Sequence, residues 1–96
     1  PLAATQSATP DGLAASTITL NFTLGTRAVR LCNIGTQTVF VRTREAGDAT
    51  AATALNGIPL PAGQTEIFTI GNDVTNLSVF TSAAGSTVYS TIGEGI

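Results

Sequence analysis

Apolar and polar residues alternate most regularly between residues 16 and 25. Ile18, Leu20, Phe22 and Leu24 fall on one side of an extended chain, and mainly threonine and asparagine residues fall on the other side. Side chains of a strand point alternately to its two faces, so this pattern indicates one buried face and one face covered by water or hydroxyl groups. We therefore predict a β-strand over residues 16–25.

The next two apolar segments, residues 27–34 and 38–44, are rich in β-branched residues and are joined around Gly35. Glycine adopts the positive φ that a tight connection needs, and Asn33 tolerates it better than most residues, so the pattern predicts a β-hairpin. Both segments carry apolar residues on two faces and therefore need cover on two faces. We predict that this hairpin lies at the centre of a sandwich and continues residues 16–25 into an antiparallel meander.

Three more segments with strand character follow, separated by turn residues: residues 65–70, 77–81 and 87–92. Residues 58–60 contain one proline and precede another, and each proline removes a ladder donor, so we predict an edge segment there. No alternation of strands with helices occurs. Short strands at regular spacing predict an all-β fold, an antiparallel β-sandwich or barrel of about six or seven short strands.

The first 15 residues are small and polar, with a turn at residues 10–12, and show no helical or strand periodicity. We predict that residues 1–15 form an extended N-terminal arm, which Leu2 and Leu13 anchor on a neighbouring subunit. Residues 16–96 then form a single β-sandwich domain.

Residues 45–57 form the longest segment without strand character in this domain. Asp48 is a candidate N-cap for a short helix, but the segment has no amphipathic stripe, so we predict a loop with at most one helical turn. Long loops in compact domains are often functional. Asp48 and Leu55 are therefore candidate partner contacts.

Charged residues make up only 10% of the chain, against about 25% in typical soluble domains. Charges at interfaces must be desolvated, so this composition favours a subunit of an assembly. The alternative is a free β-domain with a hydroxyl-covered surface. All positive charge is arginine, which suits interface ion pairs because it binds carboxylates in a fork. The four arginines lie on the predicted hairpin and are candidate partner contacts: Arg27, Arg30, Arg42 and Arg44.

Several partner classes receive no support from the sequence. A net charge of −2 gives no electrostatic footprint for nucleic acid. No apolar run approaches the about 18 residues of a membrane span. The first residues lack the basic and apolar regions of a signal peptide, and Pro1 suits a mature N-terminus after loss of methionine, so we expect synthesis in a cytoplasm.

Catalytic chemistry is equally unsupported. The chain has no histidine and no lysine, which leaves carboxylates and Tyr89 for acid–base work. The acids are scattered on turns and loops, and the closest pair, Glu45 and Asp48, is interpreted as a solvated loop face. One cysteine without histidine excludes zinc, and no segment has calcium-ligand spacing. Cys32 is predicted to be a small buried hydrophobe. We predict a protein that is not an enzyme and has no cofactor.

Residues 58–70 (IPLPAGQTEIFTI), residues 87–95 (TVYSTIGEG) and the hairpin core VRLCNIGTQTVFV resemble small proteins encoded among the structural genes of tailed bacteriophages. The likeness covers residues 27–95. It implies a virion structural protein, a capsid decoration (cement) protein of the small β-sandwich kind. Its partners would be the major capsid protein, whose outer lattice it binds and stabilises, and neighbouring copies of itself as a homo-oligomer. The resemblance implies a location on the virion surface after synthesis in the host cytoplasm.

Two other functions stay open. A head–tail or tail-module structural protein would share this composition and fold but would be present in few copies per particle. A carbohydrate-binding β-sandwich would need an exposed aromatic platform, for which Tyr89 is the one candidate, since the chain has no tryptophan. The four phenylalanines are predicted to lie in the core: Phe22, Phe40, Phe68 and Phe80.

Overall fold

The computed structural model describes residues 6–12, 14–19, 28–45, 47–70 and 74–93, and the structural statements that follow concern these residues. This part of the chain contains eight strands and no helix. The strands are β1 (Gln6–Ala8), β2 (Ser16–Thr19), β3 (Ala28–Gly35), β4 (Val39–Glu45), β5 (Ile58–Leu60), β6 (Thr65–Thr69), β7 (Val74–Phe80) and β8 (Ser86–Gly93).

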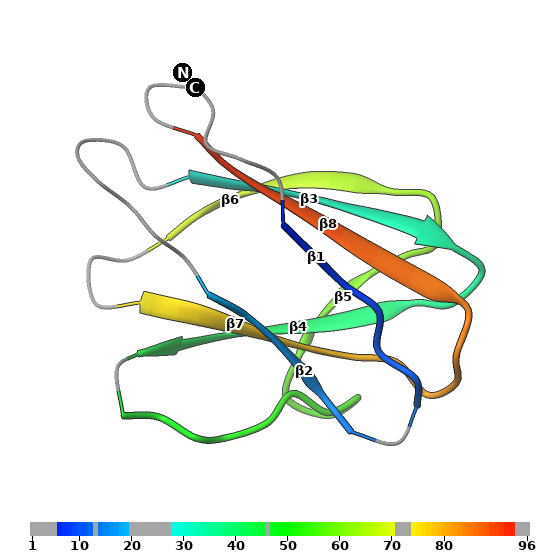
Figure 1. The fold of residues 1–96 in the computed structure, drawn as a ribbon, viewed down its shortest axis with the longest axis horizontal. Helices are drawn as coiled ribbons and strands as arrows, with labels where there is room; N and C mark the ends of the chain where they lie inside the picture. The colour runs from blue at the N-terminus through cyan, green and yellow to red at the C-terminus, as the bar shows by residue number, and fades with distance from the viewer. Residues whose placement is uncertain (1–5, 13, 20–27, 46, 71–73, 94–96) are drawn as a thin grey trace.

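The strands form two antiparallel four-stranded sheets that pack face to face (Figure 1). Sheet A has the order β1-β8-β3-β6 and sheet B has the order β2-β7-β4-β5. The pairs β4–β5, β3–β6, β2–β7 and β1–β8 are those of one long antiparallel hairpin. Rolling that hairpin up adds the pairs β3–β8 and β4–β7, which is the jelly-roll arrangement. The predicted all-β antiparallel sandwich is thus confirmed, with eight strands where about six or seven were expected.

The predicted hairpin between residues 27–34 and 38–44 is wrong. β3 and β4 lie in different sheets, and residues 36–38 cross from one sheet to the other. The meander with the preceding strand is also wrong, since β2 pairs with β7. The central position of both strands is confirmed, because β3 lies between β8 and β6 and β4 lies between β7 and β5. A short connection that contains glycine indicates that the chain reverses its direction. Here the reversal joins β3 to β4, which lie in the two sheets that pack face to face.

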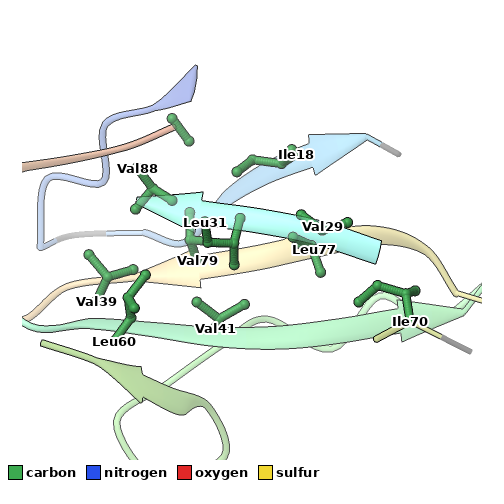
Figure 2. Close-up of a cluster of buried hydrophobic side chains, with 11 residues drawn as sticks. Ile18, Val29, Leu31, Val39, Val41, Leu60, Ile70, Leu77, Val79 and Val88 are labelled. Atoms are coloured by element: carbon green, nitrogen blue, oxygen red, sulfur yellow. The ribbon is translucent and has the colours of Figure 1, made fainter. Parts of the chain in front are cut away.

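The core between the sheets is aliphatic (Figure 2). Its largest members are almost completely buried and come from six strands: Ile18, Val29, Leu31, Val39, Val41, Leu60, Leu77, Val79 and Val88. Burying a side chain of this size contributes about 1.5–3 kcal/mol. The predicted core position is wrong for Phe40 and Phe80, whereas Phe68 does pack against the core. Phe40 and Phe80, in register with each other across β4 and β7, are half-buried on the outer face of sheet B, and Phe68 is half-buried against the core. Phe22 lies outside the described residues.

The loop between β4 and β5 packs on the outer face of sheet B. Ala52 is buried, and its N–H donates to the Ser78 hydroxyl on β7 at 2.9 Å. The described part of the loop contains one turn of helical type, closed by the Gly57 N–H donating to the Thr53 carbonyl at 3.1 Å, and a tighter turn in which the Asp48 N–H donates to the Glu45 carbonyl at 3.0 Å. The expectation of at most one helical turn is confirmed for these residues. Asp48 caps no helix; its carboxylate accepts from the Thr50 N–H at 2.9 Å in an Asx-turn.

Part of the predicted N-terminal arm belongs to the chain's own sandwich. β1 pairs with β8 at the edge of sheet A, and the buried Thr81 hydroxyl donates to the Pro10 carbonyl at 3.3 Å. Residues 1–5 and 13, which include the predicted anchors Leu2 and Leu13, lie outside the described residues. The predicted edge segment is confirmed, since β5 pairs with β4 alone among the described strands.

Candidate functional site

Two of the candidate arginines are engaged inside the protein. Arg44 donates from Nε to the Asn76 side-chain oxygen at 2.6 Å and from a terminal nitrogen to the Thr17 hydroxyl at 2.9 Å. Arg42 forms an ion pair with Asp48 at 3.5 Å, with about a third of each side chain exposed. These contacts tie β4 to β7, to β2 and to the covering loop. Arg42 and Arg44 therefore serve the packing of sheet B, and Arg27 lies outside the described residues.

Arg30 is placed differently. It is exposed on the outer face of β3, between Thr91 of β8 and Ile67 of β6 in the strand register. Among the described residues the ion pair of Arg42 with Asp48 is the only one, so Arg30 has no carboxylate partner there. An arginine on an open sheet face presents the donors of its guanidinium to an incoming group.

Arg30 lines a partly open pocket of about 250 Å³ on the outer face of sheet A. The pocket is formed by side chains of three adjacent strands: Arg30, Cys32, Thr65, Tyr89 and Thr91. They meet because the alternating residues of β3, such as Val29 and Leu31, point into the core. The guanidinium, the phenol and the two threonine hydroxyls make this pocket rich in hydrogen-bond donors.

The Cys32 thiol lies on this outer face and is half-buried, accepting from the Thr65 hydroxyl at 3.2 Å. The prediction that Cys32 is a buried core residue is therefore wrong. β3 places Cys32 between Arg30 and Ile34 on one side, and places Asn33 on the buried side. The strand alternation was readable in the sequence, but apolar residues on both sides hid which side faces the core.

Three large apolar side chains surround the pocket and are exposed: Ile34 (54%), Ile67 (62%) and Tyr89 (43%). These three residues and the pocket residues lie on one surface, which we call the outer face of sheet A. Aromatic side chains and arginine are enriched in protein interfaces, and lysine is depleted. The outer face of sheet A has this composition.

The other two candidates within the described residues lie on the opposite side of the sandwich. Leu55 is 98% exposed in the loop that covers sheet B, and Asp48 belongs to the same loop. The described partner-contact candidates thus divide between two faces, and Arg30 is the one of them on sheet A, where Tyr89, the candidate sugar platform, also lies. Sequence reasoning missed Ile34 and Ile67, because both were counted with the apolar residues of predicted buried strands.

The pKa of Asp48 is held below its ordinary value of 3.8, chiefly by the hydrogen bonds from the Thr50 N–H and hydroxyl and also by the Arg42 guanidinium. A carboxylate with a lowered pKa stabilises the folded state above its ordinary pKa, and this contribution disappears as the pH falls through the lowered value. We therefore expect Asp48→Asn to lower stability modestly at pH 7 and to have no effect at pH values below the lowered pKa.

Urea unfolding of both proteins across the acid range measures this difference. A stability loss that is the same at every pH would contradict the electrostatic role of Asp48 and would indicate a purely steric effect of the amide.

Within the described ranges, no three histidine, cysteine, aspartate or glutamate side chains lie close enough together to hold a metal ion. The same residues include no helix that is long and apolar enough to cross a membrane. No protein-family model matches the sequence, and no curated protein matches it. The arguments about function therefore depend on the geometry of the outer face of sheet A and on the resemblance of the sequence.

Proposed function

We propose that this protein is a structural subunit that binds a repeating protein shell through the outer face of sheet A. The assembly is, on the sequence resemblance, a bacteriophage capsid, with the major capsid protein as partner and the decoration and stabilisation of the head as the role. One observation carries the proposal: exposed Ile34, Ile67 and Tyr89 surround Arg30, which has no carboxylate partner among the described residues.

The chemistry of this face suits a protein partner. Covering the three exposed apolar side chains gives a favourable term of about 25 cal/mol for each Å² removed from water. Arg30, which has hydroxyl groups beside it and no carboxylate partner among the described residues, suits an acidic side chain of the partner, and such a pair gains strength when the rim excludes water. The other named residues of the outer face of sheet A are uncharged, so removing this face from water costs little free energy.

The fold supports this role by analogy alone. Eight-stranded jelly rolls occur in viral capsid domains and also in lectin domains. A fold class does not determine function, so the analogy is compatible with both the shell-binding role and the sugar-binding alternative.

We predict that Arg30→Glu weakens binding to shells that lack this protein by about tenfold or more, because the reversed charge meets the acidic partner group. Leu55→Ser, on the opposite side of the sandwich, is the control and leaves binding unchanged. Co-sedimentation of purified protein with such shells measures both variants, and circular dichroism verifies that each variant is folded. Loss of binding in Leu55→Ser with normal binding by Arg30→Glu would move the contact to the loop over sheet B.

Tyr89 beside Arg30 also supports a second function, the binding of an acidic sugar. A tyrosine ring stacks on a sugar, and arginine with hydroxyl groups holds its carboxylate. Binding to a panel of acidic glycans that is abolished by Tyr89→Ala, together with no binding to shells, would favour this function over the structural one.

A further inference from the structure

Strand β6 forms one edge of sheet A and hydrogen-bonds only to β3 among the described strands. Its five residues are Thr65, Glu66, Ile67, Phe68 and Thr69, and all of them except Phe68 are exposed. The backbone groups that point away from β3 therefore have no strand partner in the described part of the chain. An open edge of this kind is a template for pairing with another strand.

The other edges of the two sheets are less suited to pairing. β1 and β5 have three residues each, and β5 contains Pro59, which has no N–H to donate. β2 has four residues in the described part of the chain. Natural edge strands are usually protected by proline, lysine, a bulge or short length. β6 has no proline and no lysine, Glu66 is its one charged residue, and within the described residues it is the longest of the four edge strands.

The sequence of β6 is complementary to itself in the antiparallel direction. A two-fold axis through Ile67 places Ile67 opposite Ile67 of the second copy and Thr65 opposite Thr69. β-Branched residues then face each other on the outer face of the sheet, which is a favourable cross-strand pairing. This register pairs all five residues. Shifting the axis to Glu66 would place two carboxylates directly opposite each other.

We infer that β6 pairs with β6 of a second copy of this chain, with the two-fold axis at Ile67. The two sheets A become one continuous eight-stranded sheet, and the two outer faces lie side by side on the same surface. This inference goes beyond the proposed function, because it concerns the edge of sheet A and not its face.

The pairing is weak by itself. Five residue pairs form a small interface, below the area of a stable protein complex. On a repeating shell the neighbouring copies are held close together, and the effective concentration of β6 reaches about millimolar. The dimer contact then links copies that the outer faces of sheet A have already bound.

Sedimentation velocity at protein concentrations up to about 1 mM tests the inference, because this range reaches the effective concentration on a shell. We expect a monomer–dimer equilibrium, and we expect Ile67→Lys to raise its dissociation constant about tenfold or more, because two lysines face each other at the axis. Ile34→Lys is the matched control, since Ile34 is similarly exposed on the same sheet face but lies on β3. It keeps the dimer.

Mixing Ile67→Lys with Ile67→Glu tests the register, since opposite charges then meet at the axis. We expect the mixture to form a heterodimer, although each variant alone remains monomeric. In a Cys32→Ser background, Ile67→Cys forms an intermolecular disulfide on mild oxidation, whereas Thr65→Cys does not.

A wild-type protein that stays monomeric at every concentration, or a dimer that Ile67→Lys leaves intact, would overturn the inference. Neither result bears on the outer face of sheet A, which Arg30→Glu tests separately. Conversely, failure of Arg30→Glu to weaken shell binding leaves the β6 dimer in place.

Discussion

Replacing Gly35 by alanine is expected to lower the free energy of unfolding by about 4 kcal/mol, because a strained backbone and a steric overlap coincide there. Gly35 has a φ of +145°, which residues with a side chain rarely adopt. A Cβ atom at this position would overlap the Gly85 carbonyl oxygen and lie 2.6 Å from the Ser86 Cα. Either the crossing from β3 to β4 or the start of β8 must therefore move to make room for the methyl group.

Thermal unfolding followed by circular dichroism measures this effect, and a loss of this size lowers the midpoint by about 15–30 °C in a domain of this length. Gly63→Ala is the matched control. Gly63 also has a positive φ, +78°, but nothing lies within 4 Å of its Cβ position, so we expect a loss of only about 1 kcal/mol. Equal losses in the two variants would show that the contact between the crossing and residues 85–86 is unimportant.

Asn33→Ala is expected to lower the free energy of unfolding by about 3 kcal/mol, because two hydrogen bonds from the buried side-chain amide are lost and a cavity opens. Asn33 is completely buried in β3. Its amide donates to the Leu60 carbonyl at 2.9 Å and to the Gln37 carbonyl at 2.8 Å. The Asn33 side chain thus holds the crossing that leads to β4, and it also holds the edge strand β5 of the opposite sheet.

The same substitution at Asn56 provides the control for Asn33→Ala. Asn56 is exposed, and its side chain closes a surface turn by accepting from the Thr53 N–H and donating to the Ala51 carbonyl. We expect Asn56→Ala to cost less than about 1 kcal/mol. Thermal unfolding compares the two variants, and an Asn33→Ala protein as stable as Asn56→Ala would contradict the linking role of Asn33.

The sequence predicted the strands better than their pairing. Alternating and β-branched segments located the described strands from β2 onward, because side-chain periodicity is a local property. Pairing depends on contacts between distant segments. β3 pairs with β8 and β4 with β7, and nothing in the connection at Gly35 encodes whether the next strand pairs or crosses to the other sheet.

The role of Asn33 could not be predicted from its preference for turns. The sequence suggested it as a residue tolerant of positive φ, but no described residue other than glycine has a positive φ. Its structural role comes from the side-chain amide, which donates to the Gln37 carbonyl in the crossing and to the Leu60 carbonyl of the opposite sheet. This role depends on the jelly-roll crossing and could not be recognised before the crossing was known.

The candidate site was predicted in part. The sequence identified the arginines as the positively charged candidates, but its pattern could not show which of them form contacts within the protein. Arg44 reaches Asn76 on β7, which is far away in the sequence, and Arg30 lies on the opposite sheet from it. An arginine that makes intramolecular contacts can be distinguished from one that faces solvent only when the sheet to which each strand belongs is known. For the same reason Ile67 and Tyr89 could not be combined into one face with Arg30.

The central proposal is that this chain binds a repeating shell, and the copy number in purified particles tests it most directly. Quantitative mass spectrometry against the major shell protein gives the ratio. The proposal predicts a ratio near one copy per shell subunit or a simple fraction of it. A small fixed number of copies per particle would instead indicate a head–tail or tail component, and particles without the protein would contradict the structural role and favour the sugar-binding alternative.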